Sequence, residues 1–309
     1  MALLEVKGLY KEFTKGKTRF AAVDHIDLQV EAGECLGLVG ESGCGKSTTA
    51  QLILHLLKAD GGEIWFDNKL LKSNSDMKEV RSDLQMIFQN PVDSFDPRCT
   101  LLNGVKQGLR FFDNPGKDEL DRRAKDAISF VGLKESYHKR RICQLSGGEC
   151  QRAAIARAIL AQPKLIICDE ATSALDVSVQ AQVIDLLKRL KAEKQMSYLF
   201  ITHDLMLAHA MCDRIAVMYR GEIVESGTAE QILKSPAHPY TKMLLSCVLP
   251  PRVTKEFHFV DCSPVRQEAS GGCKFYEYCP NASAKCSENA PTLEMQNDRQ
   301  VACFYPQEQ

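Results

Sequence analysis

Residues 35–47 read CLGLVGESGCGKS, and this stretch decides the fold. Its first part, Cys35–Val39, is a short apolar run that predicts a buried strand. Gly40–Ser47 then match the pattern G-x-x-x-x-G-K-[ST], and Lys46–Leu57 repeat apolar residues at helical spacing. Glycines let such a loop wrap so that its backbone N–H groups converge on a phosphate. The stretch therefore predicts a strand, a phosphate-binding loop and a helix.

Each polar group of this loop has an expected role. We expect Lys46 to reach the β- and γ-phosphates of a nucleotide and the Ser47 hydroxyl to hold Mg²⁺. Cys44 lies in a nest of N–H groups at a helix N-terminus, so we expect a lowered thiol pKa and alkylation that blocks nucleotide binding. The alternative is a small residue that faces away. The predicted nucleotide-binding residues of the loop are Gly40, Ser42, Gly43, Cys44, Gly45, Lys46, Ser47 and Thr48.

The rest of the chain continues an α/β rhythm. Further strands are predicted at Leu84–Phe88, Leu165–Cys168, Tyr198–Thr202 and Ile215–Tyr219, with a helix at Val177–Lys191. Strands that alternate with helices predict a mostly parallel sheet covered on both faces. A polar section from about residue 90 to 141 interrupts the rhythm and predicts an inserted helical lobe. After about Pro250 the apolar periodicity becomes sparse and cysteines become frequent, which predicts a domain boundary.

Composition excludes several classes of protein. The chain has 309 residues, of which 44% are hydrophobic and 26% charged, as in ordinary globular proteins. Its formal net charge of −1 gives no support to a nucleic-acid partner. The sequence has no apolar stretch of about 18–20 residues, as a membrane span requires, and its start does not resemble a signal peptide. We therefore expect a cytoplasmic protein that reaches a membrane only by docking on other subunits.

Two further segments carry polar groups suited to nucleotide chemistry. Asp169 and Glu170 follow the apolar run LIIC, which places both carboxylates at the carboxyl end of a predicted parallel strand, where ligands gather. We expect Asp169 to support Mg²⁺ and Glu170 to polarise an attacking water. Residues 145–149 read LSGGE and enter a helix, which predicts a second anion-binding turn. Two such turns in one chain make sense if the second serves a nucleotide held by another subunit.

Together these motifs resemble those of ABC ATPases. LSGGE resembles the ABC signature, Gln89 the Q-loop glutamine, Ser173–Asp176 the D-loop and His203 the switch histidine. Phe13 lies where the family stacks an aromatic ring on adenine, with Tyr10 as the near alternative. The resemblance covers roughly residues 3–250. It implies a P-loop NTPase (RecA-like) core with an N-terminal antiparallel β region and a helical subdomain inserted at about 90–160. The expected domains are an ABC ATPase domain, 1–250, and a cysteine-rich C-terminal extension, 251–309.

The resemblance also implies a mechanism in which two ATPase subunits close head to tail. Glu170, His203 and Gln89 are then the expected catalytic residues, and Ser47, Gln89 and Asp169 the expected Mg²⁺ site. Ser146, Gly147 and Gly148 would contact the nucleotide of the partner subunit. The sequence departs from the family pattern twice. Glu149 replaces a glutamine in the signature and Ala171 replaces a proline, and we expect both changes to be tolerated.

Within the family, the sequences of several segments are similar to those of the ATPases of peptide and nickel importers. These segments are MIFQNPVDSFDPR, DEATSALDVSVQAQV, YLFITHDL and SPAHPYTKMLL. The expected function is the ATPase subunit of a peptide importer, with a nickel or other solute importer as the alternative. A non-transport ABC ATPase and a weakly catalytic regulatory subunit are further alternatives. The expected partners are a paralogous ATPase in a heterodimer, two membrane permeases and an extracellular substrate-binding protein, with the chain peripheral on the cytoplasmic face of the membrane.

The C-terminal cysteines need a separate explanation. Of the thirteen cysteines, Cys273, Cys279, Cys286 and Cys303 follow the spacing C-x5-C-x6-C-x16-C, whereas Cys262 has no place in this pattern. Four thiolates suit either Zn²⁺ or an iron–sulfur cluster, and four unligated thiols are the remaining alternative. The segment resembles the C-terminal extension of peptide-importer ATPases, and that resemblance implies a [4Fe–4S] cluster held by these four cysteines.

Overall fold

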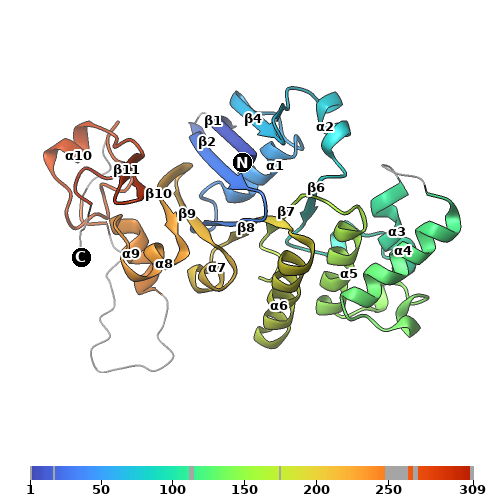
Figure 1. Ribbon diagram of the computed structural model, residues 1–309. Coiled ribbons are helices and arrows are strands. Elements are labelled where there is room, and N and C mark those ends of the chain that lie inside the picture. The colour runs from blue at the N-terminus through green and yellow to red at the C-terminus, as the bar shows by residue number, and fades with distance from the viewer. Residues whose placement is uncertain are drawn as a thin grey trace, which may run out of the picture.

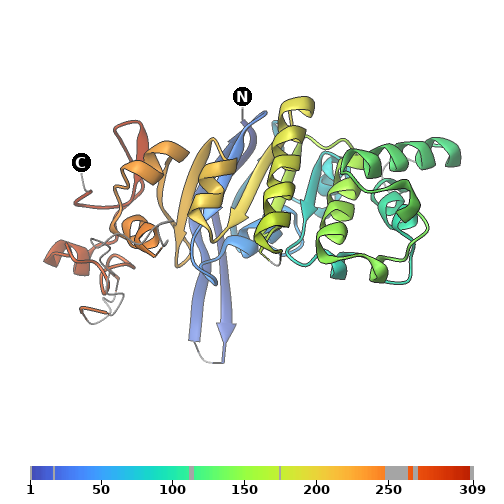
Figure 2. The ribbon, with the colours of Figure 1, turned by 90° about the horizontal axis from the view of Figure 1, so that it is seen from below.

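The structure is a computed structural model that describes residues 2–16, 18–110, 115–173, 175–247, 264–266 and 271–306. Two β-sheets form the centre of the molecule, and helices pack around them (Figure 1). In two views at right angles, helices α3 (Leu101–Arg110), α4 (Lys117–Phe130) and α5 (Gly147–Leu160) lie at one end of the molecule (Figures 1 and 2). The cysteine-rich C-terminal segment lies at the opposite end.

The larger sheet has eight strands in the order β11-β12-β10-β9-β3-β8-β7-β6. Strands β6, β7, β8, β3 and β9 pair in parallel, whereas β10, β12 and β11 pair antiparallel at one edge. The expected mostly parallel sheet is thus a mixed sheet, in which five parallel strands are extended at one edge by three antiparallel strands. Its strands are β3 (Cys35–Val39), β6 (Leu84–Ile87), β7 (Leu165–Asp169), β8 (Ser197–Thr202), β9 (Arg214–Tyr219), β10 (Glu222–Thr228), β11 (Glu294–Gln296) and β12 (Arg299–Val301).

The parallel pairing brings three chain segments to one edge. Every residue of β3, β7 and β8 is buried, as expected for central strands covered on both faces. Val39 pairs with Thr202, and Asp169 pairs with Ile201. The segments that leave the carboxyl ends of β3, β7 and β8 are therefore neighbours, although they are far apart in the sequence.

The smaller sheet is antiparallel, with the order β2-β1-β4-β5. Its strands β1 (Ala2–Lys15) and β2 (Thr18–Glu31) form a long hairpin that projects from the body (Figure 2). Helix α1 (Lys46–Ile53) contacts β2 of this sheet and β7 of the larger one, so it lies between the two sheets. One buried cluster, which includes Leu9, Leu38 and Ile53, joins the sheets around α1. The remaining strands are β4 (Gly61–Phe66) and β5 (Lys69–Leu70).

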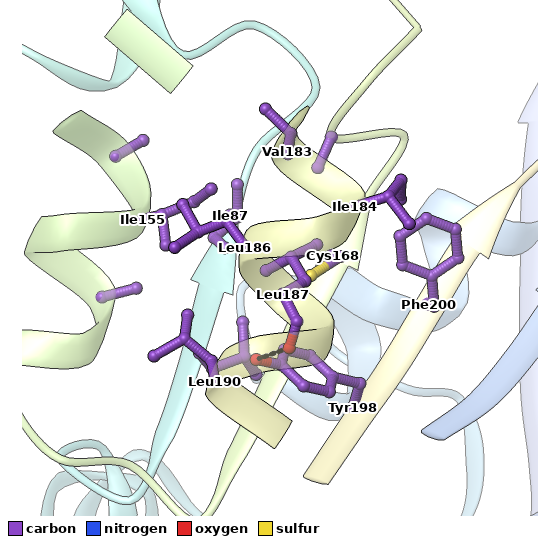
Figure 3. Packing of buried hydrophobic residues seen from close by; sticks show 14 of the residues in the cluster. Ile87, Ile155, Cys168, Val183, Ile184, Leu186, Leu187, Leu190, Tyr198 and Phe200 are labelled. Carbon is purple, nitrogen blue, oxygen red and sulfur yellow. Dashed lines mark hydrogen bonds between the residues drawn. The ribbon is translucent and has the colours of Figure 1, made fainter. Parts of the chain in front are cut away.

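Helix α6 (Val177–Lys194) covers the face of the parallel strands that is opposite to α1 (Figure 3). Its side chains Ile184, Leu187 and Leu190 pack against Tyr198 and Phe200 of β8, within a buried cluster that extends to α5. The Tyr198 hydroxyl donates a hydrogen bond to the Leu187 carbonyl at 3.3 Å. The single polar atom of this ring is therefore satisfied inside the apolar layer.

Helices and short turns complete the described chain. The helices not yet bounded are α2 (Asn74–Val80), α7 (Leu205–Met211), α8 (Ala229–Lys234), α9 (Pro239–Ser246) and α10 (Ala284–Glu288). The 3₁₀ turns are η1 (Val92–Ser94), η2 (Glu135–Tyr137) and η3 (Ile142–Gln144). None of the helices in the described ranges combines the length and the apolar character that crossing a bilayer requires.

The elements predicted from the sequence are present, with shifted ends. The helix predicted at Lys46–Leu57 ends at Ile53, because the backbone turns left-handed at His55 (φ 52°). The C-terminal segment joins the larger sheet through β12, where Val301 pairs with Glu225 of β10. Residues 248–263, which surround the predicted domain boundary, lie outside the described part of the chain.

Leu187 provides a test of this packing. We predict that Leu187→Ala lowers the free energy of unfolding by about 2–5 kcal/mol, because it leaves a cavity under α6. Leu56→Ala makes the same chemical change at a residue that is 58% exposed, so it should cost less than about 0.5 kcal/mol. Urea unfolding followed by circular dichroism measures both. Equal midpoints for the two variants would contradict this account of the core.

Candidate functional site

The predicted phosphate-binding loop connects β3 to α1. Gly45 is the N-cap residue of α1 and has a φ of 115°, a conformation that L side chains rarely adopt. A Cβ atom at this position would lie 2.1 Å from the Ala22 carbonyl oxygen. Both the φ angle and the close approach require glycine here. The first turn of α1 follows directly, and its N–H groups point to the space that the loop encloses.

Lys46 is buried and bends back over the loop. Its ammonium group donates hydrogen bonds to the carbonyls of Gly40 at 2.7 Å and Glu41 at 2.8 Å. A buried charge needs such partners, because its desolvation is otherwise unfavourable. The two carbonyls therefore hold a positive charge within the loop, where a phosphate would lie.

A cavity of ≈ 410 Å³ opens above the loop and brings together residues from five chain segments. Of the predicted site residues, it is lined by Phe13, Ser42, Gly43, Gly45, Lys46, Ser47, Thr48, Gln89 and Glu170. Phe20, which sequence reasoning missed, also lines it. Phe20 pairs with Phe13 across the β1–β2 hairpin, with ring centroids 6.0 Å apart. Predicting a hairpin around residues 14–18 would have paired these rings. Tyr10, the alternative to Phe13, instead stacks on His25.

Asp169 does not line this cavity itself but lies next to Ser47, which does. The Ser47 hydroxyl donates a hydrogen bond to Asp169 Oδ1 at 2.9 Å. Burial raises the pKa of Asp169, which the bond from Ser47 opposes, while the Glu170 carboxylate raises it further and Lys46 lowers it. A carboxylate desolvated in this way gains from a nearby cation. Ser47 and Asp169 together thus present oxygen atoms of the kind that Mg²⁺ prefers.

Glu170 lies between the two other predicted catalytic residues. Its Oε2 accepts a hydrogen bond from Gln89 Nε2 at 2.8 Å, and its Oε1 lies 3.5 Å from His203 Nδ1. The backbone of Glu170 has a φ of 45°, a left-handed conformation that costs about 1–3 kcal/mol and is common at functional sites. The Glu170 N–H bonds to the Ile201 carbonyl at 3.0 Å, which holds this conformation. The carboxylate is thereby aimed at the cavity from the end of β7.

The second predicted anion-binding turn lies at the start of α5. Ser146 caps the helix, and its hydroxyl accepts a hydrogen bond from the Glu149 N–H at 3.3 Å. Gly148 packs against α6, because a Cβ there would lie 2.4 Å from Val179 Cγ1. Within the described chain, Ser146, Gly147 and Gly148 are not among the residues that line the cavity above the loop. One chain therefore does not bring its two predicted phosphate sites together. Ala174 of the D-loop lies outside the described residues.

The glutamate of this turn is held by its own helix. Glu149 Oε2 accepts a hydrogen bond from the Ser146 N–H at 2.8 Å, so the two residues form a reciprocal cap. This bond, together with the Ser146 hydroxyl, Tyr137 and Arg140, lowers the pKa of Glu149. The negative charge is thus engaged at the helix N-terminus.

The expectation of a lowered thiol pKa at Cys44 is wrong, whereas its place in nucleotide binding stays a prediction. Burial raises the pKa of its thiol, and the nearby Lys46 ammonium, 3.8 Å from Cys44 Sγ, only partly opposes this effect. The side chain is buried against the apolar cluster around α1 and does not line the cavity above the loop. Burial of this side chain favours the alternative interpretation, a small residue that faces away.

The four C-terminal cysteines surround one small cavity. Cys273, Cys279, Cys286 and Cys303 line a space of ≈ 20 Å³ together with His238 and Phe275. Burial, with a smaller contribution from the neighbouring thiols, raises the pKa of Cys273 to about 11. In the described part of the chain, no group of three or more His, Cys, Asp or Glu side chains is arranged to hold a metal ion. The structure thus shows a shared cavity but no metal-binding group. Cys262 lies outside the described residues.

Two family descriptions match this chain. Residues 23–173 match "ABC transporter", and residues 224–286 match "Oligopeptide/dipeptide transporter, C-terminal region". The first match includes the loop, Gln89 and Glu170, and the second includes α9 and three of the four cysteines that line the small cavity.

Named relatives match between 80% and 98% of the chain. The oligopeptide transport ATP-binding protein OppF of Salmonella typhimurium is 41% identical over 321 residues, which are 98% of this chain and 96% of that protein. OppF of Bacillus subtilis is 43% identical over 250 residues, 80% of this chain and 82% of that protein. The dipeptide transport ATP-binding protein DppF of Haemophilus influenzae is 37% identical over 315 residues, 98% of this chain and 96% of that protein.

Solved structures confirm the fold. The dimeric post-hydrolysis structure of the ATP-binding cassette MJ0796 with ADP and Pi has a TM-score of 0.67 at 29% identity. It covers 73% of this chain and 98% of that one. The cbiO1 structure from Clostridium perfringens, part of an ABC transporter complex, has a TM-score of 0.68 at 27% identity, with 76% and 91% covered. This chain therefore belongs to the ABC transporter family, as an ATPase that carries the oligopeptide/dipeptide transporter C-terminal region.

Proposed function

We propose that this chain hydrolyses ATP to power an importer of di- and oligopeptides. The observation that carries the proposal is the cavity of ≈ 410 Å³, which gathers the glycine-rich loop, Gln89 and Glu170 in one place. The named relatives transport oligopeptides or dipeptides, which supports peptides as the cargo. The cargo itself is recognised by other subunits of the transporter.

The loop holds the phosphates in this proposal. Its N–H groups and the N-terminus of α1 bind the phosphate oxygens, and Lys46 reaches the β- and γ-phosphates from its position beside Gly40. Thr48 continues the same helical turn. Phe13 stacks on the adenine ring, and Phe20, paired with it across the hairpin, widens that platform.

The residues around Ser47 fit a magnesium ion. The Ser47 hydroxyl, the Asp169 carboxylate and the Gln89 side-chain carbonyl are the proposed donors, and Ser47 already bonds to Asp169. When bound, Mg²⁺ neutralises charge on the phosphate oxygens.

Glu170 acts as the general base. A water held by its carboxylate attacks the γ-phosphorus, and the bond from that phosphorus to the bridging oxygen of ADP breaks. ADP leaves with the bonding electron pair, and the proton of the water passes to Glu170. His203 and Gln89 orient the carboxylate and the attacking water, since both contact Glu170.

A second ATPase subunit completes the site. Ser146, Gly147 and Gly148 are not among the described residues lining the cavity of their own chain, so we propose that they bind the nucleotide of the partner subunit. The partner is a paralogous ATPase in a heterodimer. Glu149 bonds to the Ser146 N–H, so its charge is engaged by its own helix N-terminus.

The remaining parts follow the family plan. We assign residues 1–250 to the ATPase domain, with a helical subdomain at about 90–160, and residues 251–309 to a C-terminal extension. Two membrane permeases dock near Gln89, and an extracellular binding protein delivers peptides to them. The chain then works as a peripheral protein on the cytoplasmic face of the membrane.

We further propose a [4Fe–4S] cluster in the C-terminal extension. The cavity shared by Cys273, Cys279, Cys286 and Cys303 supports it, because thiolates are the usual ligands of such clusters. Zn²⁺ is the alternative occupant.

Glu170→Gln tests the proposed function. We predict that this variant still binds ATP but that its turnover falls by at least about 100-fold, because the general base is lost. In a strain without the gene, wild type should restore uptake of labelled peptide and the variant should not. Glu193→Gln, an exposed residue of α6, is the matched control and should behave as wild type. Uptake of nickel rather than peptide would contradict the proposed cargo.

Metal analysis tests the cluster. After anaerobic purification we predict about four irons and about four sulfides per chain, with a visible absorbance band. Cys279→Ser should lose the iron, whereas Cys143→Ser, which changes an exposed cysteine, should keep it. Stoichiometric zinc without iron, or protein free of both metals, would contradict the cluster.

A further inference from the structure

Helix α9 contacts the phosphate-binding loop. α8 and α9 lie beside the antiparallel edge of the larger sheet, at the end of the molecule that holds the cysteine-rich segment (Figure 1). Tyr240, in the first turn of α9, is fully buried, and its hydroxyl oxygen accepts a hydrogen bond from the Glu41 N–H at 3.1 Å. We propose that Tyr240 is a positioning residue for ATP binding, whose hydroxyl group fixes the first peptide unit of the loop.

The peptide unit between Gly40 and Glu41 is held from two sides. Its N–H group bonds to Tyr240, and its carbonyl, that of Gly40, accepts the hydrogen bond from Lys46 at 2.7 Å. In a trans peptide the N–H and C=O groups point in opposite directions, so rotation of the plane would break both bonds. The Tyr240 hydroxyl therefore fixes the carbonyl that orients the Lys46 ammonium group.

Aromatic packing fixes the ring of Tyr240. It lies against Tyr219, with ring centroids 4.5 Å apart, and against Phe275 at 5.6 Å in an edge-to-face arrangement. Tyr219 belongs to β9, and Phe275 lines the cysteine cavity. Such contacts favour one ring orientation, so the hydroxyl has a defined position.

A buried carboxylate fixes the backbone that precedes Tyr240. Glu225 of β10 is fully buried and accepts hydrogen bonds from the N–H groups of Ala237 at 2.8 Å and His238 at 3.0 Å. Arg299 of β12 pairs with the same carboxylate at 3.5 Å. His238 Nδ1 then accepts the Tyr240 N–H at 3.1 Å and caps α9. Strands β10 and β12 and helix α9 thus support the loop together, in addition to β3 and α1, which the loop connects.

Loss of the hydroxyl should weaken ATP binding and leave the chemistry intact. The Glu41 N–H would lose a partner and the peptide could rotate, which disturbs Lys46 in the ground state and in the transition state alike. Such a loss of uniform binding raises KM without lowering kcat. Glu170, Gln89 and His203 are held by other elements and keep their geometry.

Tyr240→Phe is the direct test, on the full-length chain with ATP. We expect KM and the dissociation constant for ATP to rise by roughly threefold to tenfold, as loss of one hydrogen bond implies, with kcat within about twofold of wild type. Tyr198→Phe is the matched control, because it also removes a buried hydroxyl bonded to a backbone group but lies on α6 and β8. Its ATP affinity should equal that of wild type.

Hydrogen exchange provides a second measurement. In wild type without nucleotide, the Glu41 amide should be protected, and Tyr240→Phe but not Tyr198→Phe should speed its exchange. Unchanged ATP affinity in Tyr240→Phe, an equal loss in Tyr198→Phe, or an unprotected Glu41 amide in wild type would overturn the proposal.

The inference about Tyr240 rests on the proposed role of Gly40–Ser47 in binding ATP. Different results would contradict the inference and that role. Wild type that does not bind ATP would contradict that role, whereas normal binding with no effect of Tyr240→Phe would contradict only the inference.

Discussion

The parallel pairing of β3, β8 and β7 is the constraint on which the site depends. Because these strands are aligned, the loop after Val39, the carboxylates after Cys168 and the imidazole after Thr202 emerge side by side. The Ser47–Asp169 hydrogen bond and the contacts of Glu170 with Gln89 and His203 follow from that alignment. α6 on one face and α1 on the other cover the central strands with apolar side chains, and the polar groups of the site lie at this edge. The alignment of these buried apolar strands thus determines which polar residues meet at the site.

The C-terminal segment has a structural connection to the same site. β12 extends the larger sheet, Arg299 and Glu225 hold the chain before α9, and Tyr240 reaches the loop. Phe275 carries the packing onward to the cysteine cavity. A segment that composition alone marks as an appendage is therefore packed against the nucleotide-binding half of the chain. Any occupant of the cysteine cavity lies one aromatic layer from the residue that we propose positions the loop.

Much of the fold and of the candidate site was predictable from the sequence, because the decisive features are local. An apolar run followed by G-x-x-x-x-G-K-S specifies a strand, a loop and a helix start within a few residues. Other features depend on distant parts of the chain. Tyr240 and Glu41 are 199 residues apart in sequence, and Phe20 reaches the cavity only through the hairpin register. Cys44 shows the limit most clearly, since its local sequence predicts an acidic thiol and its burial produces the reverse. α1 ends at Ile53 although Leu56 and Leu57 continue the apolar spacing.

The central claim is that the loop after β3 binds ATP through a lysine placed by the fold. Calorimetric titration of Mg-ATP into wild type and Lys46→Ala tests it most directly. The account predicts one ATP bound per wild-type chain. It also predicts affinity lowered by more than about tenfold in the variant, since each hydrogen bond to a charged group contributes roughly 1.5–3 kcal/mol. Equal affinity in the two proteins would mean that ATP binds elsewhere, and would contradict the account.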